Sequence, residues 1–218
     1  MGLNAASGNT DSSSLDVDAD LEPRWSPNKV KLNGQLNRGE SNGRENTNNW
    51  RVGLQYEREL RRGWLAFLYN AEESDEFQDL DLRAIVAAGP GFELLDRADT
   101  DLRMYAGPAW VNENYIGSAS DRSFGAFAWV IDFEQDLFTS DFTLFHHNRL
   151  VKAIGERPFL AQTSQGVDMD LFGDLDLKLE VQFDYASDPP PGVREKTDLR
   201  YIVKLEYELE GDETDWWQ

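Results

Sequence analysis

Ionisable side chains stand at every second position in several stretches of this sequence. In the clearest stretch, residues 175–185, Asp176, Lys178, Glu180 and Asp184 alternate with apolar residues. Successive side chains of a β-strand point to opposite faces of the sheet, so these four would share one face. Carboxylates arranged around a pore attract cations, and carboxylates can equally pair with Lys and Arg on neighbouring strands. The pattern therefore predicts either a narrow polar channel that favours cations or an interior closed by ion pairs, and both alternatives stay open.

The same reasoning applies to other stretches in which charged residues alternate with apolar ones. We expect the charged residues of these stretches to line one interior, as a channel or as a plug. They are Asp16, Asp18, Asp20, Asp81, Arg83, Arg103, Asp132, Asp176, Lys178, Glu180, Asp184, Arg200, Lys204 and Glu206.

The histidines offer little catalytic chemistry. His146 and His147 are adjacent, so within a strand their rings point to opposite faces and cannot join one metal site. The enzyme alternative is a lipase-like Ser-His-Asn site on a barrel, with Ser164 or Ser140 as nucleophile. No recognisable nucleophile motif surrounds either serine. We therefore expect no enzyme activity, no catalytic residues, no metal and no cofactor.

The elements that position the charged residues are unusually long strands. Residues 175–185 and 197–209 each alternate over about 11 to 13 residues, whereas an ordinary strand has about 5 to 6. A tilted strand that crosses a membrane needs this length, with apolar side chains facing lipid and polar ones facing inward. The alternative is a soluble, acidic β-barrel or sandwich that binds a ligand, in which the apolar face of these strands would point inward.

The alternation repeats along the chain and predicts an all-β fold, an antiparallel up-and-down transmembrane β-barrel of about 12 strands over residues 1–210. Residues 211–218 would form a short acidic and aromatic tail. An even number of strands places both ends on one side, with the longer loops 38–48, 72–78, 117–123 and 187–196 on the other. The expected strands are residues 2–7, 15–21, 29–37, 50–57, 64–69, 80–95, 102–115, 127–133, 142–150, 159–171, 175–185 and 197–209.

Composition narrows the partners. The 218 residues carry 21 Lys and Arg against 41 Asp and Glu, a net charge of −20, which argues against nucleic acid as a partner. The absence of cysteine excludes disulfides and thiolate chemistry. No apolar run is long enough for a transmembrane helix. The mean hydropathy of −0.60 is compatible with a barrel, whose lipid-facing residues alternate with polar ones.

Several short motifs recur in an order that is similar to a known family. They are Gly8-Asn9-Thr10, Asp79-Leu80-Asp81-Leu82-Arg83 leading to Gly89-Pro90-Gly91, Ala106-Gly107-Pro108, and Asp184-Tyr185 followed by Pro189-Pro190-Pro191-Gly192 and Lys196-Thr197-Asp198. Together they resemble the family of salt-induced outer-membrane proteins (YdiY-like), a domain of unknown function, over nearly the whole chain. The resemblance implies a Gram-negative outer-membrane barrel whose expression responds to salt, and it supplies no catalytic residues.

These observations predict a location and a set of partners. We expect the protein in the bacterial outer membrane, with Met1-Gly2 standing in place of a removed signal peptide. Its partners would be the lipid bilayer and, during biogenesis, the barrel-assembly machinery, and the oligomeric state is left open. The expected role is a narrow channel or a structural envelope component under salt or osmotic stress.

Overall fold

Antiparallel strands make up nearly all of the computed structural model, which describes residues 2–6, 12–117, 120–137, 141–155, 158–173, 175–189, 193 and 195–207. The elements are β1 (Gly2–Ala6), β2 (Ser12–Leu21), β3 (Arg24–Trp25), β4 (Asn28–Ser41), β5 (Arg44–Arg61), β6 (Trp64–Asp75), the 3-10 turn η1 (Glu76–Gln78), β7 (Leu80–Arg97), β8 (Thr100–Tyr115), β9 (Arg122–Leu137), β10 (Phe142–Ala153), β11 (Phe159–Phe172), β12 (Leu175–Ala186) and β13 (Thr197–Tyr207).

Each strand pairs with the next along the chain. The sheet has 13 strands, of which the two-residue β3 pairs only with β4, leaving 12 in one continuous order from β1 to β13. All of the pairings are antiparallel. The predicted all-β, up-and-down architecture is therefore confirmed. Within the described residues β1 and β13 are the two edges of the sheet, which is curled into a half-barrel.

Tight turns join several of the longest strands. Asn42 and Gly43 have φ of 53° and 70°, and Arg62 and Gly63 have 52° and 77°. Two consecutive residues with positive φ are typical of a two-residue type I′ hairpin, whose twist matches that of the flanking strands. The prediction of a solvated loop over residues 38–48 was wrong, because backbone pairing continues through these polar residues to the turn.

The predicted loop over residues 72–78 is also shorter than expected. Strand β6 runs to Asp75, and η1 alone forms the turn. The Asp75 carboxylate accepts hydrogen bonds from the backbone N–H groups of Phe77 (3.0 Å) and Gln78 (3.2 Å), as an N-cap does. Glu72 and Glu73 consequently belong to the sheet, and Glu73 points to its inner face.

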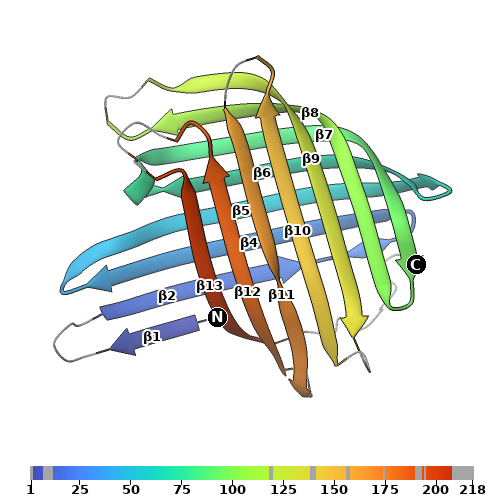
Figure 1. Cartoon of the computed structure of the whole chain (residues 1–218), viewed down its shortest axis with the longest axis horizontal. Helices are drawn as coiled ribbons and strands as arrows, with labels where there is room; N and C mark the ends of the chain where they lie inside the picture. The colour runs from blue at the N-terminus through green and yellow to red at the C-terminus, as the bar shows by residue number, and fades with distance from the viewer. Residues whose placement is uncertain are drawn as a thin grey trace, which may run out of the picture.

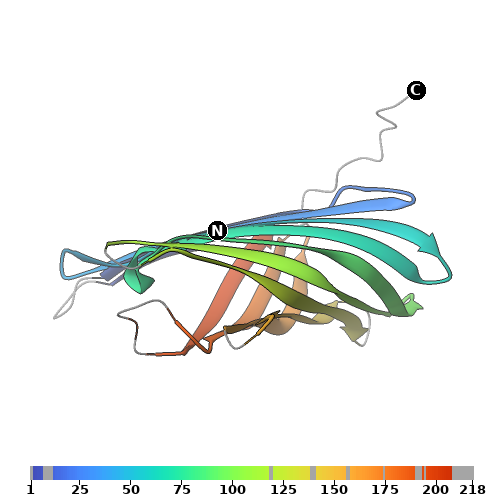
Figure 2. The same ribbon diagram turned by 90° about the horizontal axis from the view of Figure 1, so that it is seen from above.

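The sheet bends so that its two halves face each other. Figure 1 shows β10 to β13 crossing steeply over β2 to β7, and Figure 2 shows the two halves as opposite walls of a curved layer. A hydrophobic cluster fills the concave side between β6 and β11. Its buried members are Leu65, Phe67, Tyr69, Ala71, Ile85, Ala87, Tyr105, Val111, Ala126, Ala128, Val130, Val151 and Leu160.

The outer face is apolar as well. On β13, Tyr201 and Val203 are 77% and 71% exposed, whereas Lys204 is buried at 8%. On β6, Trp64 and Leu68 are exposed while their neighbours point into the core. The apolar side of the last hairpin thus faces outward, as predicted, and the alternative with an inward apolar face on these strands was wrong. In the described part of the chain, the structure contains no helix with the length and hydrophobicity of a membrane span.

Candidate functional site: the concave face and its end cleft

Most of the residues predicted to line the interior point to the concave face. Arg83, Arg103, Glu180 and Lys204 are buried. Six more are partly buried, and these are Asp132, Asp176, Lys178, Asp184, Arg200 and Glu206.

The remaining predicted residues lie at the margin of the sheet or at an irregularity. Asp16 and Asp18 belong to β2, but their side chains lie outside the described set. Asp20 is exposed at the end of the same strand. Asp81 is exposed, and its predicted inward position was wrong. The register between β7 and β8 shifts at Leu80, and such a bulge changes which side chain points inward.

A chain of buried ion pairs crosses β6, β7 and β8. The Arg83 guanidinium donates to Glu73 (Nη1 to Oε1, 2.5 Å) and to Glu113 (Nε to Oε1, 2.6 Å). Glu113 is fully buried and also accepts hydrogen bonds from Arg122 and from the hydroxyl of Tyr115. Buried carboxylates require such partners, because an unpaired buried charge is costly.

Other contacts tie the two halves of the sheet together. Arg51 on β5 donates to Glu73 (Nε to Oε2, 2.8 Å) and reaches Asp184 on β12 (Nη2 to Oδ2, 3.4 Å). Lys31 on β4 donates to Asp132 on β9 (Nζ to Oδ2, 3.2 Å). The guanidinium of Arg149 on β10 stacks over the ring of Tyr69 on β6, 4.2 Å from its centroid. These contacts bridge the two walls.

A second cluster of charged residues lies towards the end of the strands away from η1. Arg103 pairs with Glu93 (2.7 Å), Asp101 (2.9 Å) and Glu57 (3.5 Å). Lys178 lies 3.3 Å from Glu206. The concave face therefore carries ion pairs towards both ends of the strands. The hydrophobic cluster of β6 to β11 lies on the same face.

Glu22, in the connection between β2 and β3, lies at the end of the strands away from η1 and is exposed. Its carboxylate lies 2.5 Å from Lys29 Nζ and 4.0 Å from Lys31 Nζ. Burial by itself would raise the pKa of Glu22, but the charges of Lys31 and Lys29 outweigh it and hold the pKa below its ordinary value of 4.5.

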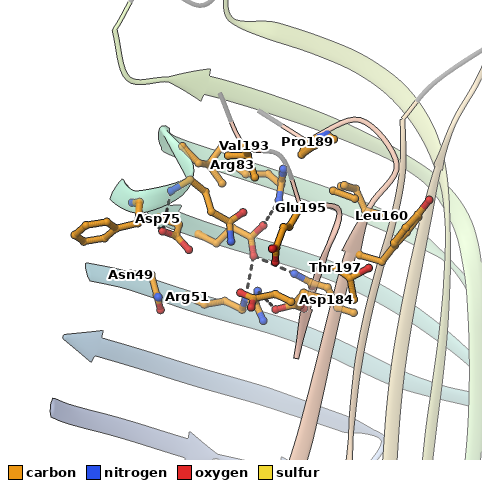
Figure 3. A pocket seen from close by; sticks show the side chains of 18 of the residues that line it. Asn49, Arg51, Asp75, Arg83, Leu160, Asp184, Pro189, Val193, Glu195 and Thr197 are labelled. Atoms are coloured by element: carbon orange, nitrogen blue, oxygen red, sulfur yellow. Dashed lines mark hydrogen bonds and ion pairs between the residues drawn. The ribbon is translucent and has the colours of Figure 1, made fainter. Parts of the chain in front are cut away.

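At the η1 end, the two walls enclose a cavity of about 390 Å³. Figure 3 shows Arg51, Arg83, Asp184 and Glu195 reaching into this space from strands on both sides and from the segment that joins β12 to β13. Arg200 on β13 donates to Asp184 (Nη2 to Oδ2, 2.6 Å). The cleft thus has a floor of paired charges on the sheet and a rim formed by η1, Val193 and residues 195–198.

A serine and a histidine of the lipase-like alternative lie in register but do not form an activated nucleophile. Ser164, His147 and Asp132 occupy facing positions on β11, β10 and β9. His147 Nδ1 lies 3.4 Å from Asp132 Oδ1, but the Ser164 hydroxyl donates to Glu180 Oε1 at 2.5 Å. A serine nucleophile needs its hydroxyl bonded to the base. Ser140, the other candidate, lies outside the described residues, among which no three His, Asp or Glu side chains could together hold a metal ion.

Sequence reasoning missed four of the central charged residues: Arg51, Glu57, Glu73 and Glu113. Glu113 stands an even number of positions after Arg103, so continued alternation along β8 would have found it. Arg51 and Glu57 share a face by the same rule. Glu73 was missed because the acidic stretch around it predicts a loop over residues 72–78.

Comparison with known protein families gives a match over nearly the whole chain. The family model described as "Protein of unknown function, DUF481" matches residues 1–209. No curated protein matches the sequence.

Proposed function

We propose a function for this chain, which belongs to the DUF481 family of proteins of unknown function, from the two faces of its sheet. The protein is a non-enzymatic β-barrel protein of the Gram-negative outer membrane. Its role is that of a structural envelope component with a closed interior, not that of an open channel.

The outward apolar face is the observation that carries this proposal. Trp110, Phe127 and Trp129 on the neighbouring strands β8 and β9 are 56%, 49% and 44% exposed, and exposed Val and Leu continue this face on β5 and β13. Soluble monomers rarely expose contiguous apolar patches of this extent. A lipid bilayer is the solvent in which such a surface is stable, and strands of this length can cross it.

The filled interior favours a structural role over conduction. Aliphatic and aromatic side chains pack on the concave face of β6 to β11, and Lys31–Asp132 and Arg51–Asp184 bridge the two walls. An ion would have to displace these contacts to pass. The bonding of the Ser164 hydroxyl to Glu180 supports a non-enzymatic role.

The test is refolding into phosphatidylcholine vesicles, followed by conductance in a planar bilayer. We expect stable insertion into the vesicles and no discrete conductance steps. In gel electrophoresis, the inserted protein should unfold more slowly on heating than protein without vesicles. Cation-selective steps that are lost in the variant Asp176→Asn with Glu180→Gln would overturn the closed interior and establish a channel. A monomer that remains soluble without detergent would overturn the membrane assignment itself.

The location and its consequences are part of the same proposal. Fractionation of a Gram-negative host that expresses the chain with a signal peptide should recover it with outer-membrane porins, and depletion of the barrel-assembly machinery should reduce its insertion. The family resemblance adds that transcription rises with external salt, which a reporter fusion measures. Recovery in the soluble periplasmic fraction would contradict the location.

A further inference from the structure

The charges around the end cleft are separated by depth. The floor carries the guanidinium groups of Arg51, Arg83 and Arg200. They pair with the carboxylates of Glu73, Asp184 and Glu113. The rim carries Glu195 and Lys196, which precede β13, and Asp198 at the start of β13. The arginines of the inner part are therefore balanced by carboxylates, whereas the mouth of the cleft has an excess of negative charge.

The floor retains donors for a ligand. A guanidinium has five N–H donors, and within the described residues Arg200 hydrogen-bonds only to Asp184, through Nη2. Arg51 uses Nε for Glu73 and makes a long Nη2 contact of 3.4 Å to Asp184. Both side chains keep about a quarter of their surface exposed, at 26% and 28%. These groups can bind an anion without breaking the ion pairs of the floor.

The rim provides the opposite chemistry. Glu195 and Asp198 are exposed, and neither forms an ion pair with any other residue that the structure describes. Asp75, by contrast, is occupied by the N–H groups of η1. Phe77, which also lines the cleft, is 51% exposed.

We propose that this cleft binds a small zwitterionic solute. Its anionic group lies against Arg51 and Arg200, and its ammonium group lies between Glu195 and Asp198. The cavity of about 390 Å³ falls within the range of small-molecule sites. Because the cleft is on the concave face, opposite the apolar outer face, the solute arrives from water and not from the lipid.

Three probes of equal chain length separate the charges: γ-aminobutyrate, butyrate and n-butylamine. Their binding is measured by calorimetry to the full chain in dodecyl maltoside micelles, with empty micelles as the blank. We expect saturable binding of γ-aminobutyrate in the millimolar range normal for so small a ligand. Butyrate and butylamine should each bind about tenfold more weakly or worse, because one charge-assisted contact is missing.

Variants test the placement of the two groups. Arg200→Gln should weaken γ-aminobutyrate about tenfold or more and remove the residual binding of butyrate. Asp198→Asn should weaken γ-aminobutyrate but leave butyrate unchanged, and this exposed position does not endanger folding. Arg97→Gln, at an exposed arginine that ends β7, is the matched control and should change nothing. Near-ultraviolet circular dichroism verifies that each variant is folded.

The outcomes separate this proposal from the membrane function. Butyrate that binds as tightly as γ-aminobutyrate would reduce the cleft to an anion site, and butylamine that does so would reduce it to a cation site. Either result overturns the assignment, as does the absence of saturable binding for all three probes. Since the measurement is made in micelles, it stands whatever the conductance or fractionation experiments give.

Discussion

Replacing Arg83 should expose how strongly the buried ion pairs support the fold. Arg83 is 8% exposed and bridges Glu73 and Glu113 at 2.5 and 2.6 Å. Arg83→Gln removes the charge that both carboxylates share while keeping a neutral polar side chain. Glu113 then remains fully buried with one cation, Arg122, and Glu73 retains Arg51.

The magnitude follows from these remaining partners. Removing one member of a buried ion pair costs about 3 to 5 kcal/mol, because the other charge is left uncompensated. Both carboxylates keep another arginine, so we expect the lower end, a loss of about 3 kcal/mol in the free energy of unfolding. This corresponds to a change of more than about 100-fold in the unfolding constant.

The assay is urea unfolding in phosphatidylcholine vesicles, followed by tryptophan fluorescence. The midpoint should shift with an unchanged slope, as for a pure loss of stability. The control is Arg38→Gln, whose ion pair with Glu45 is short at 2.7 Å but whose side chain is 67% exposed. Exposed pairs contribute about 0 to 1 kcal/mol. If Arg83→Gln is no more destabilising than Arg38→Gln, the interior is hydrated and the assignment of a closed plug fails.

Three further predictions address the outer face and Glu22, in the connection between β2 and β3. Leu54→Arg, in the middle of the outer face of β5, should lower the free energy of unfolding in vesicles by about 2 to 4 kcal/mol. Leu60→Arg, near the turn, should cost about 0 to 1 kcal/mol, and equal costs would contradict a bilayer around the sheet. Brominated lipids should quench the fluorescence of the exposed Trp129, so Trp129→Phe should reduce the quenched fraction, and an unchanged fraction would place this face away from lipid. The lowered pKa of Glu22 means that its contribution is present at neutral pH and is lost as the pH falls through and below 4.5. Because Glu22 is half-exposed, Glu22→Gln should lower the free energy of unfolding by less than about 1 kcal/mol at neutral pH. In acid the variant and the unchanged protein should be equally stable; a stability difference that grows in acid would reverse the assigned sign.

The periodicity of two in strands such as β12 and β13 determined much of the architecture. It predicted the strands and the outward direction of Leu199 to Leu205, because side-chain direction in a strand depends only on local alternation. The even number of strands followed from the expectation that both ends of a barrel lie on one side. The same rule failed at Asp81, where a register shift that is set by pairing with β8 displaces the side chain. It also failed for residues 38–48, because polar residues can continue a ladder whose hydrogen bonds come from the backbone.

Only the tertiary structure decided what lies inside. On β6 both faces are apolar, so the sequence did not indicate that Leu65, Phe67 and Tyr69 point inward while Trp64 and Leu68 point outward. The pairs Lys31–Asp132 and Arg51–Asp184 join strands far apart in sequence. They meet because the sheet bends until its halves face each other, a consequence of accumulated twist and coiling over many strands. Local alternation specifies which side chains share a face, but curvature specifies which of them touch across it, and those contacts bridge the two halves of the sheet and shape the cleft.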